Sequence, residues 1–238
     1  MELTQGTLLG GRVRYAQPVQ GYRTGIEPVL LAASVPARPG QRVLEGGTGA
    51  GAGLLCLAAR VPGLVGLGIE RDPAMAALAR RNLADNGQGF DILQADVSAA
   101  RDAGPVDHAF ANPPWHDPAA TRSPDRMRDG ATHRDAEGLV AWIAALGACL
   151  DPAGTLTMVL PALLAGEAIA MLHGAGLGQL TLFPLWSRAG SNAKIVLVQA
   201  CAGSGAARVA AGLALHGEGQ GYTAEAEAVL RGGCGLCL

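Results

Sequence analysis

Long hydrophobic runs are missing from this 238-residue chain, although hydrophobic residues make up 49% of it. The longest apolar stretches, 146–150 and 156–164, end well before the roughly 20 residues that a membrane span needs. The first residues also lack the basic segment followed by an apolar segment that a secretory signal requires. We therefore expect a soluble, cytoplasmic protein that binds no membrane.

A strong charge of one sign is lacking too. The chain has 18 basic and 20 acidic residues, a formal net charge of −2, and Lys194 is its one lysine. This balance excludes an overall positive field that would hold nucleic acid. Any nucleic-acid partner would have to be bound by a local basic patch.

Cysteine and histidine are few and scattered. The five cysteines are odd in number, which fits reduced thiols in a cytosolic protein. Cys234 and Cys237 have the spacing of a redox or metal pair, but no second pair accompanies them. The five histidines show no spacing suited to metal ligation. We expect no metal site.

From residue 42 onward, apolar strands alternate with amphipathic helices, which predicts a mostly parallel, doubly wound sheet. Strands are expected at 42–45, 64–70, 90–95, 106–111, 155–160, 180–185 and 194–199, and helices at 50–60, 73–86, 136–150 and 161–174. Only residues 187–193 separate the last two strands, too few for a crossover helix, so these strands should pair antiparallel. The predicted fold is a seven-stranded, Rossmann-like α/β sheet with six parallel strands and one antiparallel edge strand.

Extensions flank this core. The N-terminal residues predict a short hairpin at 8–15 and a helix at 26–35. At the other end, small residues at 201–208 lead to a short helix at 224–230. We divide the chain into an N-terminal hairpin and helix (1–40), a core domain (41–200) and a C-terminal appendix without an assigned role (201–238).

A glycine-rich turn follows the first strand of the core. The segment Glu45-Gly46-Gly47-Thr48-Gly49-Ala50-Gly51 has the pattern E-x-G-x-G-x-G and leads from a strand into a helix. Glycines at 47, 49 and 51 let the backbone approach a ligand without interference from a Cβ atom. A nucleotide-like cofactor is expected here, but the same glycines also fit a permissive dinucleotide pattern.

Two further acids distinguish between the cofactors. Glu70 ends the second strand, where a carboxylate can accept both hydroxyls of a ribose, and Asp96 follows the third strand, within reach of an adenine amine. With Glu45 they place carboxylates after three consecutive strands, in one crevice. This lining suits S-adenosylmethionine, a net cation without phosphates, and would repel the pyrophosphate of a dinucleotide.

The fourth strand runs into Asn112-Pro113-Pro114-Trp115 at the same edge of the sheet. The nitrogen of an adenine amine or an amide is a poor nucleophile because its lone pair is delocalised. A site that methylates it must accept both amine hydrogens and aim the lone pair at the methyl donor. Asn112 and the Pro113 carbonyl supply two acceptors, the proline pair stiffens the loop, and Trp115 offers a face for stacking. We predict these four residues to be catalytic.

These motifs give the chain a resemblance to a known family. Residues 4–200 resemble the class I S-adenosylmethionine-dependent amino-methyltransferases with an Asn/Asp-Pro-Pro-Tyr/Phe/Trp motif, and within them the bacterial tRNA(Val) adenine-N6 methyltransferase family. The resemblance implies S-adenosylmethionine as the cofactor and an anticodon-loop adenosine of tRNA as the target. It also rests on the segments Leu9-Gly10-Gly11-Arg12, Gln17-Pro18, Gly21-Tyr22-Arg23, Leu30-Leu31-Ala32-Ala33 and Lys194–Gln199.

The resemblance further implies that the segment from Tyr22 to Glu27 closes over the methionine end of the cofactor. No strong general base is expected, because the amine becomes acidic as it is alkylated. The residues expected to bind the cofactor are Tyr22, Arg23, Thr24, Gly25, Glu45, Gly47, Thr48, Gly49, Gly51, Glu70, Arg71, Asp96, Val97 and Asn112.

An RNA target would have to be single-stranded or flipped out, since a base in a duplex cannot reach Asn112. The stretch 116–135 carries four arginines that could meet phosphates, but four aspartates balance them. Further basic candidates are Arg12, Arg14, Arg188 and Lys194.

Other functions stay open. The chain could be a glutamine-N5 methyltransferase that acts on a release factor, because a glutamine amide presents the same planar NH2 to the same motif. Guanine-N2 methylation of ribosomal RNA uses the same geometry. The intact motif at 112–115 disfavours a silent cofactor-binding or RNA-binding module. An NAD-dependent reductase would need a proton donor beside the nicotinamide, and the sequence shows no compelling Tyr/Lys or His/Asp set for that role.

Overall fold

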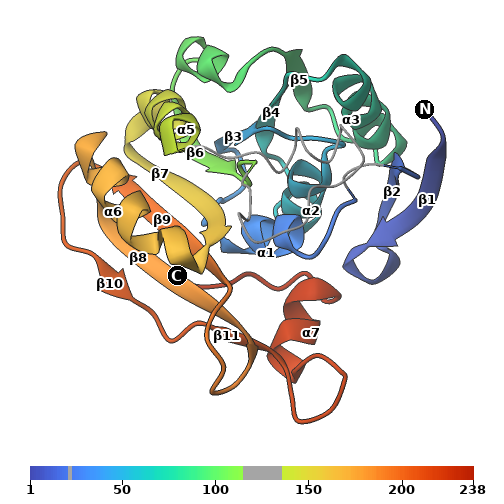
Figure 1. Cartoon of the computed structure of the whole chain (residues 1–238). Helices are drawn as coiled ribbons and strands as arrows, with labels where there is room; N and C mark the ends of the chain where they lie inside the picture. Colours follow the sequence, from blue (N-terminus) through green and yellow to red (C-terminus); the bar gives the residue numbers. More distant parts are fainter. Residues whose placement is uncertain (21–22, 115–135) are drawn as a thin grey trace.

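A single large sheet forms the centre of the computed structural model, which describes residues 1–20, 23–114 and 136–238 (Figure 1). Within the described residues its strand order is β10-β8-β9-β7-β6-β3-β4-β5, and β11 also pairs with β8. The strands are β3 (Arg42–Gly46), β4 (Val65–Glu70), β5 (Asp91–Gln94), β6 (Val106–Ala111), β7 (Leu150–Pro161), β8 (Leu177–Arg188), β9 (Ile195–Ala202), β10 (Arg208–Val209) and β11 (Leu213–His216). All seven predicted strands are present, and the doubly wound α/β fold is confirmed.

The antiparallel strand lies inside the sheet, so its predicted edge position was wrong. β9 pairs antiparallel with β8, as predicted, but also with β7. Val196, Leu197 and Val198 are at most 3% exposed, so β9 is covered on both faces. A continuous apolar run of this kind is typical of an interior strand. β8 lies one position further from β7, and the short connection after it places β9 between β8 and β7.

The outer side of β8 is covered by the C-terminal part of the chain. β10 and β11, which the sequence did not predict, both pair with β8 in parallel. They therefore extend the sheet beyond the seven predicted strands. The division into residues 1–40, 41–200 and 201–238 stays a prediction.

Helices cover both faces of the sheet (Figure 1). Side chains alternate along each strand: Phe110 of β6 packs in the cluster with α1, α2 and α3, while Ala109 and Ala111 pack in the cluster with α5 and α6. The described helices are α1 (Glu27–Ser34), α2 (Ala52–Arg60), α3 (Pro73–Asp85), α5 (Ala136–Ala148), α6 (Ala165–Gly174) and α7 (Ala224–Leu230), with short 3-10 turns η1 (Leu9–Gly11), η2 (Val97–Asp102) and η3 (Ala162–Leu164). No helix in these residues is long and apolar enough to cross a membrane.

The N-terminal hairpin is longer than predicted. Its strands, β1 (Leu3–Leu8) and β2 (Val13–Pro18), pair antiparallel over their whole length, and η1 joins them. The prediction covered only residues 8–15, because β1 is largely exposed and shows little apolar alternation. The hairpin lies beside α3 (Figure 1).

Candidate functional site

Four neighbouring parallel strands end at one edge of the sheet. Gly46 of β3 pairs with Ala111 of β6 on one side and with Ile69 of β4 on the other. Glu70, the last residue of β4, pairs with Gln94 of β5. Adjacent strands are about 4.8 Å apart, so the residues that follow these pairs are close neighbours. The structure thus brings the glycine turn and the Asn-Pro-Pro segment together with the ends of β4 and β5.

The glycine turn has a backbone that favours glycine at three positions. Gly47, Gly49 and Gly51 have φ angles of +63°, +55° and +88°, in the left-handed region. The N–H of Thr48 donates to the Ile69 carbonyl at 3.0 Å, and the N–H of Gly49 donates to Oε2 of Glu70 at 2.9 Å. These two hydrogen bonds therefore fix the turn to the end of β4.

Two of these glycines differ in what surrounds them. A Cβ on Gly47 would lie 2.5 Å from Cη2 of Trp142, whereas a Cβ on Gly49 would meet no described atom within 4 Å. Gly47 is therefore required by packing inside the protein. Gly49 faces open space, which is the arrangement expected where a ligand lies against the backbone.

Alanine substitutions should separate the two roles. We expect Gly47→Ala to lower the thermal stability, because the new methyl group overlaps the indole. Gly49→Ala should cost only about 1 kcal/mol of left-handed strain, yet weaken the binding of S-adenosylhomocysteine about tenfold or more. Thermal unfolding and titration calorimetry of both variants measure this. Equal losses of stability would contradict the assignment.

Trp142 is a residue of this site that the sequence did not reveal. It lies on α5, is half-buried, and its ring contacts both Gly46 and Gly47. A Cβ on Gly46 would also lie 3.2 Å from Val97, which follows Asp96. The indole and Val97 therefore both pack against the start of the glycine turn. In the sequence it stands inside an apolar helix, and nothing marks it as different from a core residue.

Glu45 faces the beginning of α2 and is only 4% exposed. Its Oε2 accepts hydrogen bonds from the Thr48 hydroxyl and from the Leu54 N–H. Burial raises the pKa of Glu45 from 4.5 to about 8, although these hydrogen bonds act in the opposite direction. The carboxyl is thus protonated at neutral pH and holds the glycine turn against α2. Its contact with a cofactor stays a prediction.

The pH dependence of folding should reveal this carboxyl. Because its pKa is raised in the folded state, its stabilising contribution is complete below pH 4.5 and is lost as the pH rises to about 8. The slope is at most about 1.4 kcal/mol per pH unit. Glu45→Gln removes the titration, so its free energy of unfolding should fall less between about pH 6 and pH 8. Urea unfolding of both proteins tests this, and identical pH profiles would contradict it.

Glu70 and Asp96 leave polar oxygens at the open side of the turn. The oxygens of Glu70 accept from the N–H groups of Gly49 and Asp72, and each keeps a second lone pair for a ribose hydroxyl. Asp96 is exposed and accepts from the Ser98 N–H at 3.0 Å. The hydrogen bonds of Ser98, and more weakly the charge of Arg71, lower the pKa of Asp96. Asp96 is therefore ionised, and the open side of the turn suits a cationic nucleoside.

The segment before α1 is held by the hairpin. The Thr24 hydroxyl is 2.8 Å from the Tyr15 hydroxyl, and the Thr24 N–H donates to Oε1 of Gln17 at 3.0 Å. A Cβ on Gly25 would collide with the Glu27 carboxylate, so the segment turns tightly there. Arg23 is exposed. The predicted residue Tyr22 lies outside the described residues.

The Asn-Pro-Pro segment leaves β6 directly beside the glycine turn. Asn112 and Pro114 are half-buried and Pro113 is buried. This packing fixes the backbone from which the Asn112 side chain and the Pro113 carbonyl extend. The predicted stacking residue Trp115 and the arginines of 116–135 lie outside the described residues. Among the residues that are described, no cluster of three or more His, Cys, Asp or Glu could hold a metal ion.

Comparison with known proteins gives consistent results. A family model described as the methyltransferase small domain matches residues 27–175. The tRNA1(Val) (adenine(37)-N6)-methyltransferase of Serratia proteamaculans is 33% identical over 144 residues, 58% of this chain and 55% of that protein. The release factor glutamine methyltransferase of Rhodospirillum rubrum is 35% identical over 151 residues, 58% of this chain and 45% of that protein. The chain therefore spans about half the length of these curated relatives.

One solved structure matches nearly the whole chain. It is described as a predicted O-methyltransferase, protein Atu636 from Agrobacterium tumefaciens. The TM-score is 0.74 and the identity is 26%, over 89% of this chain and 99% of that one. The match includes most of the chain outside the family model.

Proposed function

The chain belongs to the methyltransferase small domain family, whose cofactor is S-adenosyl-L-methionine, and from this we propose that it methylates the exocyclic N6 of an adenine in tRNA. The observation that carries the proposal is the position of Asn112 and Pro113, one and two residues beyond the pairing of Ala111 with Gly46. Two carbonyl acceptors for an NH2 group thus stand next to the turn that receives the methyl donor.

The residues present fit this cofactor. Gly49 leaves room for a ligand against the backbone, and Glu70 retains acceptors for ribose hydroxyls. Ionised Asp96 provides an acceptor for the adenine amine, and Val97 with Trp142 provides apolar surface beside it. We propose that Arg23, Thr24 and Gly25 cover the opposite end of the cofactor, together with Tyr22.

When bound, S-adenosylmethionine supplies an electrophilic methyl group. The Asn112 side-chain oxygen and the Pro113 carbonyl accept the two amine hydrogens of the target, which turns its lone pair toward the methyl group. Buried Pro113 keeps these acceptors in place, so the site contributes to catalysis by orienting the amine. The amine would become acidic as it takes the methyl group, with S-adenosylhomocysteine as the leaving group, and would lose its proton to water.

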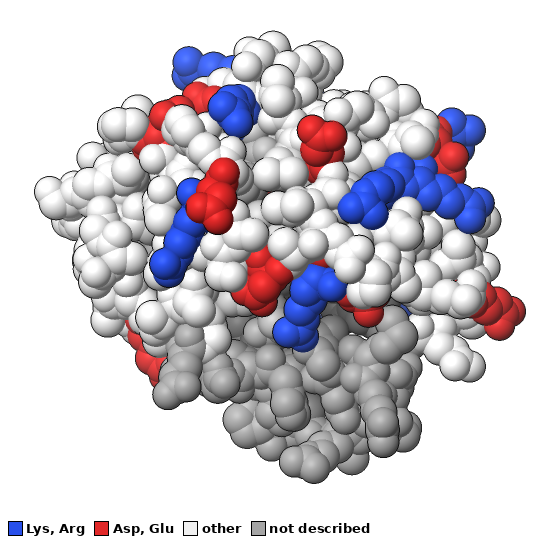
Figure 2. Space-filling view, turned by 90° about the horizontal axis from the view of Figure 1, so that it is seen from above, with Lys and Arg blue, Asp and Glu red and all other residues white. Residues whose placement is uncertain are grey.

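The proposed partner is the single-stranded anticodon loop of a tRNA. On the face in Figure 2, basic and acidic side chains are interspersed over most of the described surface, and only one short row of basic side chains stands out at its right-hand side. RNA would therefore be held by a few local contacts at the site, and its binding should depend only modestly on salt concentration. A tRNA substrate implies action in the cytoplasm.

A glutamine of a release factor is the second candidate substrate, because a relative of similar identity is named a release factor glutamine methyltransferase. Its side-chain amide offers the same planar NH2 to Asn112 and Pro113. Named relatives of both kinds match 58% of the chain, so substrate tests must distinguish them.

Methyl transfer to a panel of acceptors tests the proposal. Purified protein is incubated with tritiated S-adenosylmethionine and unmodified tRNA, ribosomal RNA, DNA or release factor, and the labelled products are digested and identified. N6-methyladenosine from tRNA is the expected result. Label on glutamine, on guanine N2 or on a hydroxyl oxygen would replace the proposal with the corresponding activity. No label despite measurable binding of S-adenosylhomocysteine would indicate a silent module.

A further inference from the structure

Asn82 of α3 connects the N-terminal hairpin to the glycine turn. Its side chain is 1% exposed. Its Oδ1 accepts from the N–H of Ala16 at 3.0 Å, and its Nδ2 donates to the carbonyls of Ala16 and Ala50, each at 2.9 Å. Ala16 belongs to β2 and Ala50 to the glycine turn. One buried amide thus joins two segments that are remote in sequence.

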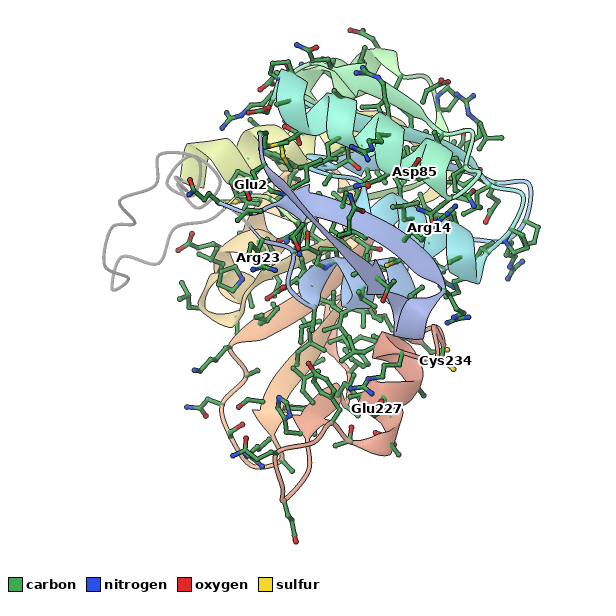
Figure 3. All side chains as sticks on the ribbon, turned by 90° about the vertical axis from the view of Figure 1, so that its right-hand side faces the viewer. Glu2, Arg14, Arg23, Asp85, Glu227 and Cys234 are labelled. Carbon is green, nitrogen blue, oxygen red and sulfur yellow. The ribbon has the colours of Figure 1, made fainter. Side chains whose placement is uncertain are left out.

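Asn86, one helical turn further along, provides a natural comparison. Its Oδ1 accepts from the N–H of Arg14 at 2.9 Å and its Nδ2 donates to the Arg14 carbonyl at 2.7 Å. The two asparagine side chains therefore form the hydrogen bonds with the β2 backbone that a neighbouring strand would otherwise form. Figure 3 shows Arg14 of β2 beside Asp85 of α3, whose carbonyl accepts a hydrogen bond from the Arg14 guanidinium. Asn86 also donates to the backbone carbonyl of Asn82 at 2.7 Å, but among the described residues its side chain forms no hydrogen bond with the glycine turn.

The same strand reaches the other side of the candidate site. Tyr15 and Gln17 flank Ala16 in β2, and both hold Thr24 by hydrogen bonds. An unbroken series of contacts therefore runs from Ala50 through Asn82 and Ala16 to Thr24. Any displacement of the hairpin relative to α3 would move the segment 23–25 relative to the glycine turn.

We propose that Asn82 is a positioning residue for the cofactor, which fixes the distance between the glycine turn and the covering segment 23–25. The hairpin is then a part of the cofactor site and more than a cap on the core. This inference rests on the proposed function, because that proposal assigns Thr24 and Gly25 to the cofactor. It adds a residue, Asn82, that lies outside the two sequence motifs.

Calorimetric titration with S-adenosylhomocysteine separates Asn82 from Asn86. We expect Asn82→Ala to raise the Kd about tenfold, and Asn86→Ala, which also frees a hairpin contact, to change it less than about twofold. With S-adenosylmethionine and a methyl acceptor, Asn82→Ala should raise the KM for the cofactor and leave kcat nearly unchanged. Equal effects of the two substitutions would overturn the proposal. A wild-type protein that binds no S-adenosylhomocysteine would overturn the cofactor site itself.

A double-mutant cycle tests whether Asn82 acts through the hairpin. Thr24→Ala and Asn82→Ala should be strongly non-additive in their effects on Kd, because the second substitution already releases Thr24 from its position. Additive effects would show that Asn82 acts on the glycine turn alone and would overturn the coupling. Where Asn82→Ala does not fold, Tyr15→Phe serves, because it leaves the buried amide intact and removes the hydrogen bond to the Thr24 hydroxyl. It should still raise the Kd, and an unchanged Kd would overturn the coupling.

Discussion

Asn112→Ala is expected to lower the rate of methyl transfer by about 10²–10³-fold at saturating S-adenosylmethionine. The substitution removes one of the two acceptors that orient the amine, and leaves the glycine turn and Glu70 intact. The Kd for S-adenosylhomocysteine should therefore change far less than the rate. Initial rates of tritium transfer and calorimetric titration of the same preparation provide the two measurements.

Asn112→Asp is the matched control, because it preserves the size of the side chain and one acceptor oxygen. It should retain measurable transfer, at a rate between those of the wild type and the alanine variant. If Asn112→Ala transferred methyl groups within about threefold of the wild-type rate, the Asn-Pro-Pro segment would not be the catalytic site. Loss of cofactor binding in parallel with the rate would instead assign Asn112 to the cofactor.

Periodicity predicted the core of the fold because its elements are long and regular. β6 and α7 have the predicted bounds, and the regular part of β7, from Thr155 onward, agrees with the predicted strand. Residues 151–154 bulge out of the pairing with β6, and no apolar pattern marks such a bulge. β10 and β11 have two and four residues, too few for a recognisable alternation. Their positions are decided by the edge of β8, which the local sequence does not contain.

The candidate site divides in the same way. The glycine turn and the Asn-Pro-Pro segment were predictable because their function requires particular residues at fixed spacing. Asn82 was not, because its main partner Ala16 is 66 residues away and a buried asparagine in a helix looks like any polar residue. The burial of Glu45 was also hidden, since an acid at the end of a strand can face either a ligand or the next helix. Only the packing of α2 decides between them.

Gly53→Ala is expected to destabilise the protein by about 2–3 kcal/mol, although alanine is favoured over glycine in a helix by about 1 kcal/mol. A Cβ on Gly53 would lie 2.0 Å from Oε1 of Glu45. The Glu45 side chain could rotate away only by breaking its hydrogen bonds to Thr48 and Leu54 in a buried environment. Urea unfolding at about pH 6 measures the change.

Gly166→Ala in α6 provides the matched control, because a Cβ there meets no described atom within 4 Å. It should be neutral or stabilising by up to about 1 kcal/mol, as helix propensity predicts. If the collision with Glu45 is the cause, Gly53→Ala should cost much less when it is introduced into Glu45→Ala, where the overlapping oxygen is gone. A Gly53→Ala protein as stable as the wild type would mean that Glu45 can leave its pocket freely. The glycine turn would then be held by its contacts with β4, through Ile69 and Glu70, and not by the carboxyl behind it.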